Sequence, residues 1–279
     1  MLNIIKSDLY RVFRGKAIYV AIILILVLAF VSCFSMSPGH IGITTSSEEQ
    51  PLIQDNEILE QVYETDSILE TRELMKKYGA YPLDKAQLGA NANLYYFFII
   101  IVVIVLVTDL SNATAKNTLS SAISRKKYYL AKLITCIGLG TLLILINNYG
   151  SYIINLIMNG KEFSAGFIEI TKLTMLQLPI LYGIISVLVC IGFCFRKIGT
   201  FNSITIPLIV VVQLIIMGVS TLFHLDTTEI LNYEFQYIIG NLISNPSNIY
   251  ILKTLLLAIF YIIGFNVIGY QVFRKTEIK

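Results

Sequence analysis

Charged residues are scarce in this sequence. Only 14% of its 279 residues are Asp, Glu, Lys or Arg, whereas 56% are hydrophobic. A soluble domain has about a quarter charged residues, so this composition argues against a soluble globular fold. The formal net charge of +3 is also too small to indicate a nucleic-acid-binding protein. The sequence therefore predicts a membrane protein with a lipid bilayer around it and no nucleic-acid partner.

Features of enzymes and ion-coupled carriers are missing as well. The four cysteines all lie in apolar runs, so we expect them to be packing residues and not parts of disulfides or a zinc site. No Gly-x-x-x-x-Gly-Lys-Ser/Thr phosphate loop is present, and ionisable residues are nearly absent at membrane depth, with Asp109 and Lys253 close to span ends. We therefore predict no catalytic residue, no cofactor and no metal, and any energy for transport must come from a partner.

Six long apolar runs predict six transmembrane helices, and hence an all-α integral membrane fold. The second run is short and is expected to borrow residues 91–93 at its outer end. Pro179 and Pro207 fall within the fourth and fifth runs, where neighbouring helices can satisfy the backbone groups that a proline frees. The expected spans are 17–36, 94–110, 133–158, 175–195, 203–223 and 251–273, in one transmembrane domain from residue 17 to residue 279.

Lys and Arg are distributed unequally between the two sides of these spans. One side holds 14 of them and the other, although its loops are longer, holds seven. Because cytoplasmic loops carry an excess of Lys and Arg, we expect both termini and the loops 111–132 and 196–202 to be cytoplasmic.

Residues 1–16 are predicted to form an amphipathic helix on the inner membrane face. Apolar residues recur there at helical spacing, opposite Lys6, Arg11 and Arg14. The expected apolar face consists of Leu2, Ile5, Leu9, Val12 and Phe13.

The long loop 37–93 is predicted to be an extracytoplasmic insertion with its own helices. It contains ten Asp and Glu residues and capping signals that predict helices near 56–63 and 67–78. Two interpretations stay open: a small helical subdomain that acts as a lid or contacts a substrate, and a solvated spacer.

A few uncharged polar residues lie inside the predicted spans. Hydrogen bonding between helices is one interpretation. The other is a polar lining for a translocation path, for which Asn147 and Asn148 are the best candidates because adjacent helical residues point in different directions. The candidate path residues are Asn147, Asn148, Ser151 and Gln213.

The loop between the second and third spans carries a family resemblance. From Asp109 it runs Asp-Leu-Ser-Asn-Ala-Thr-Ala-Lys-Asn-Thr-Leu-Ser-Ser-Ala-Ile-Ser-Arg-Lys-Lys-Tyr-Tyr-Leu-Ala-Lys. This resembles the corresponding loop of ABC type-2 transporter permeases, in which an acidic residue, a Gly-Thr-Leu step, a short apolar helix, a Ser-Arg pair and a Lys lead into the third span. Asn117 stands where the family has Gly. The positions that match are Thr118, Leu119, Ser124, Arg125 and Lys132.

The resemblance implies a transport subunit without enzymatic activity of its own. In that family the apolar turn, here Leu119 to Ile123, is a coupling helix that docks on a separate cytoplasmic ABC ATPase, and Arg125 to Lys127 would lie at the lipid headgroups. The ATPase-coupling residues would be Thr118, Leu119, Ile123, Ser124, Arg125 and Lys132.

The resemblance also implies partners, a location and classes of substrate. The chain would be a permease of a bacterial ABC exporter in the plasma membrane, paired with a second copy or a related permease. Its substrates would be antimicrobial peptides such as lantibiotics, other amphiphiles, or ions. The rival hypothesis is a non-transporting immunity or sensor protein acting through the external subdomain. A secondary carrier is disfavoured because it needs charges at membrane depth.

Overall fold

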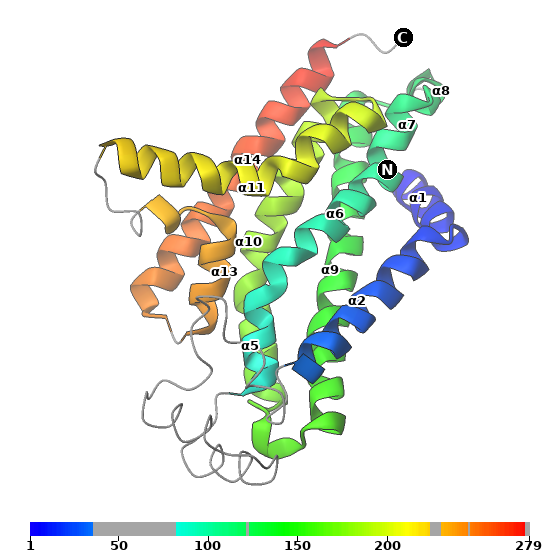
Figure 1. The fold of residues 1–279 in the computed structure, drawn as a ribbon. Helices are drawn as coiled ribbons and strands as arrows, with labels where there is room; N and C mark the ends of the chain where they lie inside the picture. The colour runs from blue at the N-terminus through cyan, green and yellow to red at the C-terminus, as the bar shows by residue number, and fades with distance from the viewer. Residues whose placement is uncertain (36–81, 121–122, 224–229, 245, 277–279) are drawn as a thin grey trace.

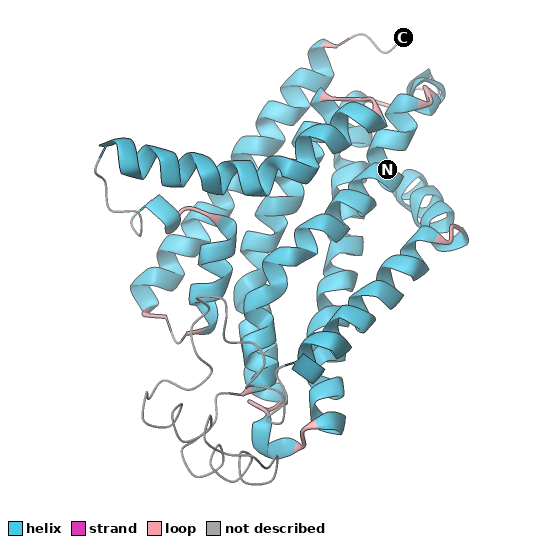
Figure 2. Cartoon of the chain, in the orientation of Figure 1, coloured by secondary structure: helices cyan, strands magenta, loops and turns pink. Residues whose placement is uncertain are grey.

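The computed structural model describes residues 1–35, 82–120, 123–223, 230–244 and 246–276. The described residues are all helical or in short connections, and six helices are long and apolar enough to cross a membrane (Figures 1 and 2). The predictions of an all-α fold and of six spans are therefore confirmed. The spans are Ala17–Phe34, Leu83–Ser111, Arg125–Met158, Lys161–Cys194, Ile198–Phe223 and Asn248–Lys275. The predicted helices at 56–63 and 67–78 lie outside the described residues.

The chain begins with a helix, α1 (Leu2–Arg14), which a short bend joins to the first span, α2 (Ala17–Ser35). The second span is a succession of five helical segments. It comprises α5 (Leu83–Gly89), the 3-10 turn η2 (Ala90–Asn93), α6 (Leu94–Val102), the π-helical turn η3 (Val103–Val107) and α7 (Thr108–Ser111). Residues 83–93, which the sequence assigned to the external loop, thus belong to this helical run.

The remaining spans are more regular. A short helix, α8 (Thr114–Ser120), precedes α9 (Arg125–Met158). After a 3-10 turn, η4 (Lys161–Phe163), come α10 (Phe167–Cys194) and α11 (Ile198–Phe223), which are helical through Pro179 and Pro207. The chain then forms α13 (Phe235–Ile243) and ends with α14 (Asn248–Lys275). The sequence did not predict α13, which packs against α5, η2 and α10.

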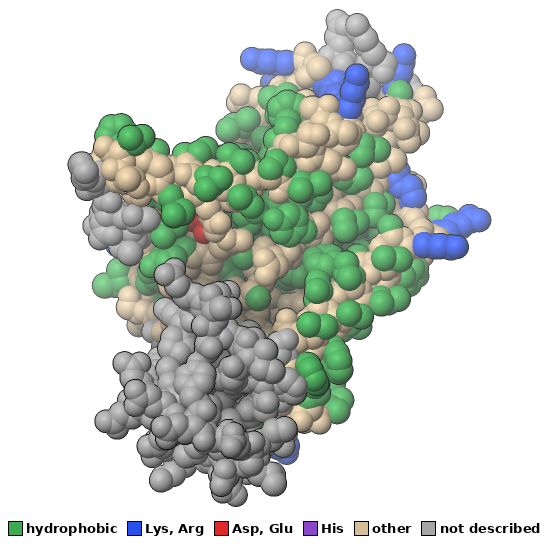
Figure 3. Space-filling model, in the orientation of Figure 1, with side chains coloured by type: hydrophobic (Ala, Val, Ile, Leu, Met, Phe, Trp, Pro, Cys, Tyr) green, Lys and Arg blue, Asp and Glu red, His purple; other side chains and the backbone are tan. Residues whose placement is uncertain are grey.

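The fourth span, α10, is the centre of the bundle. It packs along α14 and α9 and also contacts α6 and α13, and most of its second half is buried. By contrast, α11 runs across the other helices and its far end stands away from them (Figure 1). The side chains on α2 and α11 are mainly exposed and apolar, as expected for surfaces that meet lipid (Figure 3). Many apolar side chains of α14 are exposed as well.

Candidate functional site

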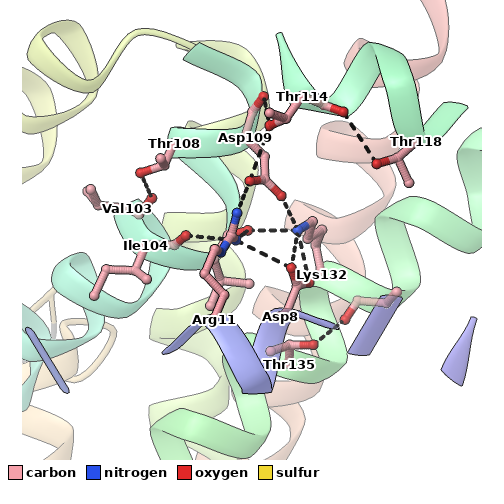
Figure 4. A network of polar contacts seen from close by, with 12 residues as sticks. Asp8, Arg11, Val103, Ile104, Thr108, Asp109, Thr114, Thr118, Lys132 and Thr135 are labelled. Carbon is pink, nitrogen blue, oxygen red and sulfur yellow. Dashed lines mark hydrogen bonds and ion pairs between the residues drawn. The ribbon is translucent and has the colours of Figure 1, made fainter. Parts of the chain in front are cut away.

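Four charged side chains meet in the interior, where α1, the second span and α9 come together (Figure 4). The Nζ of Lys132 donates to both carboxylate oxygens of Asp8, at 2.7 and 2.9 Å, and to Oδ2 of Asp109. It also donates to the backbone carbonyl of Val105 at 2.9 Å. Its side chain is only 1% exposed. Lys132 is thus a fully buried cation at the centre of the cluster.

Arg11 completes this charge network, which we define as Asp8, Arg11, Asp109 and Lys132. The Arg11 guanidinium bonds Oδ1 of Asp109 and lies 3.3 Å from Oδ1 of Asp8. It also donates to the carbonyls of Ile104 and Val105, at 3.0 and 3.2 Å. Two cations therefore face two carboxylates, and the formal charges balance. That balance matters because an unpaired charge in such a site would cost several kcal/mol.

The packing of α1 places Arg11 differently from the assignment made from the sequence. The buried residues of α1 are Ile4, Asp8 and Val12, which are four residues apart and lie on one helix face. Leu2 and Phe13, assigned to the apolar face, are exposed. Arg11, assigned to the polar face, instead points into the bundle, because Asp109 and the free carbonyls of the second span attract it there.

Burial changes the acidity of the Asp8 carboxyl. Removal from water raises the pKa of Asp8 above its ordinary value, and the neighbouring Lys132 opposes this effect without cancelling it. The ionised form of Asp8 is therefore costly to hold inside the protein even with its cationic partners.

The loop between α7 and α9 is attached directly to the charge network. The hydroxyl of Thr114, at the start of α8, donates to the backbone carbonyl of Asp109 at 3.1 Å and lies 3.4 Å from Oδ1 of the same residue. Ala113, just before it, has a φ of 56°, in the left-handed region that non-glycine residues seldom adopt. This sharp turn reverses the chain into α8, so the network and the turn together define where the loop starts.

The predicted short helix exists in this loop but earlier than expected. It covers Thr114–Ser120, whereas Leu119 to Ile123 was the expected range, and Ile123 lies after it in a non-helical connection. Leu119 and Ile123 are each half-buried and pack against the bundle. The hydroxyl of Thr118 donates back to the Thr114 carbonyl at 3.3 Å within the helix. Within α8, Thr114, Lys116 and Asn117 are exposed, whereas Ala115 is buried.

The other end of the loop is held by Ser124 and Arg125. Ser124 is the N-cap of α9 and its side chain accepts from the backbone N–H of Lys127 at 3.3 Å. Arg125 donates to the carbonyls of Phe273, Arg274 and Thr276 at the C-terminal end of α14. A cation there is favourable because the last carbonyls of a helix lack partners and carry partial negative charge.

The predicted coupling residues differ in how accessible their side chains are. Leu119 and Ile123 keep part of their surface accessible at the loop. Lys132 is buried in the charge network, so its side chain cannot contact an external partner. Asp8 was not singled out from the sequence at all. Its spacing of three residues from Arg11 is the one signal that could have suggested an ion pair.

The candidate path residues Asn147 and Asn148 both have partners inside the fold. Asn147 donates to Oδ1 of Asn91 at 2.8 Å, and Asn91 in turn donates to Oε1 of Gln177 at 2.7 Å. Asn148 donates to the hydroxyl of Thr174 at 3.0 Å. These contacts join α9 to η2 and α10. They favour hydrogen bonding between helices over a free polar lining at these two positions.

Of the other two candidate path residues, Ser151 lies one helical turn from Asn147 and Asn148 on α9, whereas Gln213 lies on another helix. Ser151 is buried, and its carbonyl accepts a weak bond from the thiol of Cys33 at 3.7 Å. Gln213, on α11, donates to the side-chain carbonyl of Gln236 in α13. The four candidate path residues therefore do not form one continuous polar surface.

No family model and no curated protein matches the chain. Within the described ranges, no group of three or more His, Cys, Asp or Glu residues is placed to hold a metal ion. What the fold defines is the class, a multi-pass α-helical membrane protein with six candidate spans. Its main polar feature, within the part of the chain that the structure describes, is the charge network beneath the α7–α9 loop.

Proposed function

We propose that this chain is the membrane-spanning permease subunit of a bacterial ABC exporter, driven by a separate cytoplasmic ATPase. The observation that carries the proposal is the α7–α9 loop. It presents a short exposed helix, α8, with an accessible apolar residue, Leu119, near its end, followed by the basic run from Arg125 to Lys127. On this proposal the exposed part of Leu119 would enter an apolar groove on the partner protein, while Ala115 of the same helix packs against the bundle.

The distribution of charge supports placing this loop in the cytoplasm. Most of the Lys and Arg side chains visible in Figure 3 lie toward the end of the bundle that carries α1, α8 and the C-terminal end of α14. Basic residues gather on the cytoplasmic side of membrane proteins, where anionic lipid headgroups attract them. On this proposal both termini are cytoplasmic, α1 lies at the inner membrane surface, and the loop between α2 and α5 is external.

The mechanism would be alternating access without covalent chemistry in this chain. ATP-driven closure of the partner ATPases would move α8, and the six-helix bundle would rock against a second copy or a related permease. Antimicrobial peptides, other amphiphiles or ions are the substrate classes that the sequence resemblance suggests. Energy would come from the partner, since the chain has no phosphate loop.

Co-purification tests the proposal. The tagged chain, expressed together with the genes that neighbour its own and purified in detergent, should retain an ATPase. Replacing Leu119 and Ile123 with Asp should release it, because two charges in an apolar groove cost about 1–3 kcal/mol or more each. Asn112→Asp is the matched control, since it adds a charge to an exposed position of the same loop. Monodisperse elution of all variants shows that they fold.

Two outcomes would contradict the proposal. The Asp variants could bind the ATPase as well as the control does, in which case this loop is not the docking element. No ATPase could bind the unmodified chain, in which case the immunity or sensor hypothesis replaces the transporter.

A further inference from the structure

The second span is interrupted by a π-helical turn close to the charge network. This turn, η3, covers Val103–Val107 between α6 and α7. A π turn breaks the regular ladder of hydrogen bonds from each carbonyl to the N–H four residues later, so carbonyls become available to side-chain donors. Such turns are uncommon, and they are found frequently at functional sites.

Side chains from two other helices donate hydrogen bonds to the backbone carbonyls of this turn. The carbonyl of Ile104 accepts from Arg11 of α1, at 3.0 Å. The carbonyl of Val105 accepts from both Arg11, at 3.2 Å, and Lys132 of α9, at 2.9 Å. The hydroxyl of Thr108 donates to the Val103 carbonyl at 2.8 Å. The two cations are thus bonded to backbone as well as to carboxylates, and Figure 4 shows them between η3 and Asp109.

This arrangement lies at the base of the α7–α9 loop. Asp109 follows η3 by two residues, and its carboxylate accepts from both Arg11 and Lys132. On its other side Asp109 accepts from Thr114 at the start of α8. If the cations only balanced buried charge, contacts with carboxylates would be enough. Their contacts with the π turn instead fix the backbone from which α7 and α8 leave the second span.

We propose that Lys132 and Arg11 are positioning residues: by donating to the carbonyls of the π turn and to Asp109, they fix the direction in which α7 and α8 leave the membrane-spanning bundle. The functional meaning of this direction rests on the proposed function, which assigns α8 to the ATPase. The positioning itself is a property of the chain alone and is tested without a partner.

Distance measurement between spin labels tests the positioning. In the full chain with its four cysteines replaced, labels would be attached at Lys116→Cys on α8 and Ile134→Cys on α9, both exposed positions. The parent should give one narrow distance distribution in lipid nanodiscs. Asp8→Asn should also give a narrow distribution, since both cations keep their carbonyl contacts.

The deciding variant is the double replacement Asp8→Asn with Lys132→Met. It restores the charge balance, leaving Asp109 with Arg11, but removes the ammonium from the Val105 carbonyl. Lys132→Met alone should lower the melting temperature and broaden the distance distribution. In the double variant we expect the melting temperature to recover toward that of the parent, whereas the distance distribution stays as broad as in Lys132→Met. If Lys132 only balanced charge and had no positioning role, both the melting temperature and the distance distribution should recover in the double variant.

Either of two results would overturn the proposal. One is a narrow, parental distribution in the double variant. The other is equal broadening in Asp8→Asn alone, which would mean that packing of α1 sets the position of α8. Failure of the ATPase to co-purify would defeat the proposed function but leave these distances unchanged, so the two failures are distinguishable.

Discussion

A single lysine holds together groups that are far apart in the sequence. The ammonium of Lys132 contacts two carboxylates, Asp8 and Asp109, and lies 5.3 Å from the ring centre of Tyr128. A buried ion pair contributes little net stability compared with apolar residues of similar size, but removal of one partner leaves a buried charge without compensation. Neutralising Lys132 should therefore lower the free energy of unfolding by more than neutralising Asp8 does.

We predict that Lys132→Met lowers the free energy of unfolding by about 3–5 kcal/mol, because two carboxylates are left with one cation. Asp8→Asn should lower the free energy of unfolding by less, because burial already disfavours the ionised form of the Asp8 carboxyl. Denaturation of both purified variants in detergent, compared with the parent, measures the difference. Equal loss of stability in the two variants would contradict the charge balance described here.

The raised pKa of Asp8 predicts a pH dependence. Because the folded protein binds this proton more tightly than the unfolded chain does, the stabilisation is full below the unfolded pKa of about 4 and is lost as pH rises through the raised pKa. The parent should thus lose stability relative to Asp8→Asn as pH rises from about 4. Thermal denaturation of both proteins across this range checks the sign. A relative gain with rising pH would show that the cations lower the pKa of Asp8 instead.

At the scale of elements, α14 approaches α10 closely at Gly269. A Cβ added at Gly269 would lie 3.1 Å from the Cα of Cys190 on α10 and 2.9 Å from the hydroxyl of Tyr129 on α9. Backbone atoms cannot move aside as a flexible side chain can. Small residues at such crossings let transmembrane helices approach closely. Gly264, in the same helix, has open space around it.

These two glycines make a matched pair of variants. Gly269→Ala should destabilise the protein by about 1–3 kcal/mol, because overpacking forces the helices apart. Gly264→Ala should be neutral or stabilising by up to about 1 kcal/mol, since alanine is the better helix former. Unfolding in detergent compares them directly. If Gly269→Ala is as stable as Gly264→Ala, α10 and α14 are not in contact at this point.

At the scale of the whole molecule, the sequence predicts the spans well because the bilayer sets their length. An apolar run of about 20 residues with almost no charge matches the hydrocarbon thickness and is rare in soluble domains. The helix α13 was missed because its nine residues are too short to stand out in a polar-looking connection. The charge network was missed for another reason. Its ion pairs join residues 98 and 124 positions apart, and amphipathic patterning assigns charged residues to the outside by default.

The side of the membrane on which the α7–α9 loop lies is the central claim, because only a cytoplasmic loop can meet an ATPase. Single cysteines at Asn112, in this loop, and at Ser244, after α13, test it in a cysteine-free background; both positions are exposed. We predict that a membrane-impermeant thiol reagent labels position 244 in intact cells, and position 112 only after the membrane is opened. Labelling of position 112 but not of position 244 in intact cells would contradict the cytoplasmic placement of the loop.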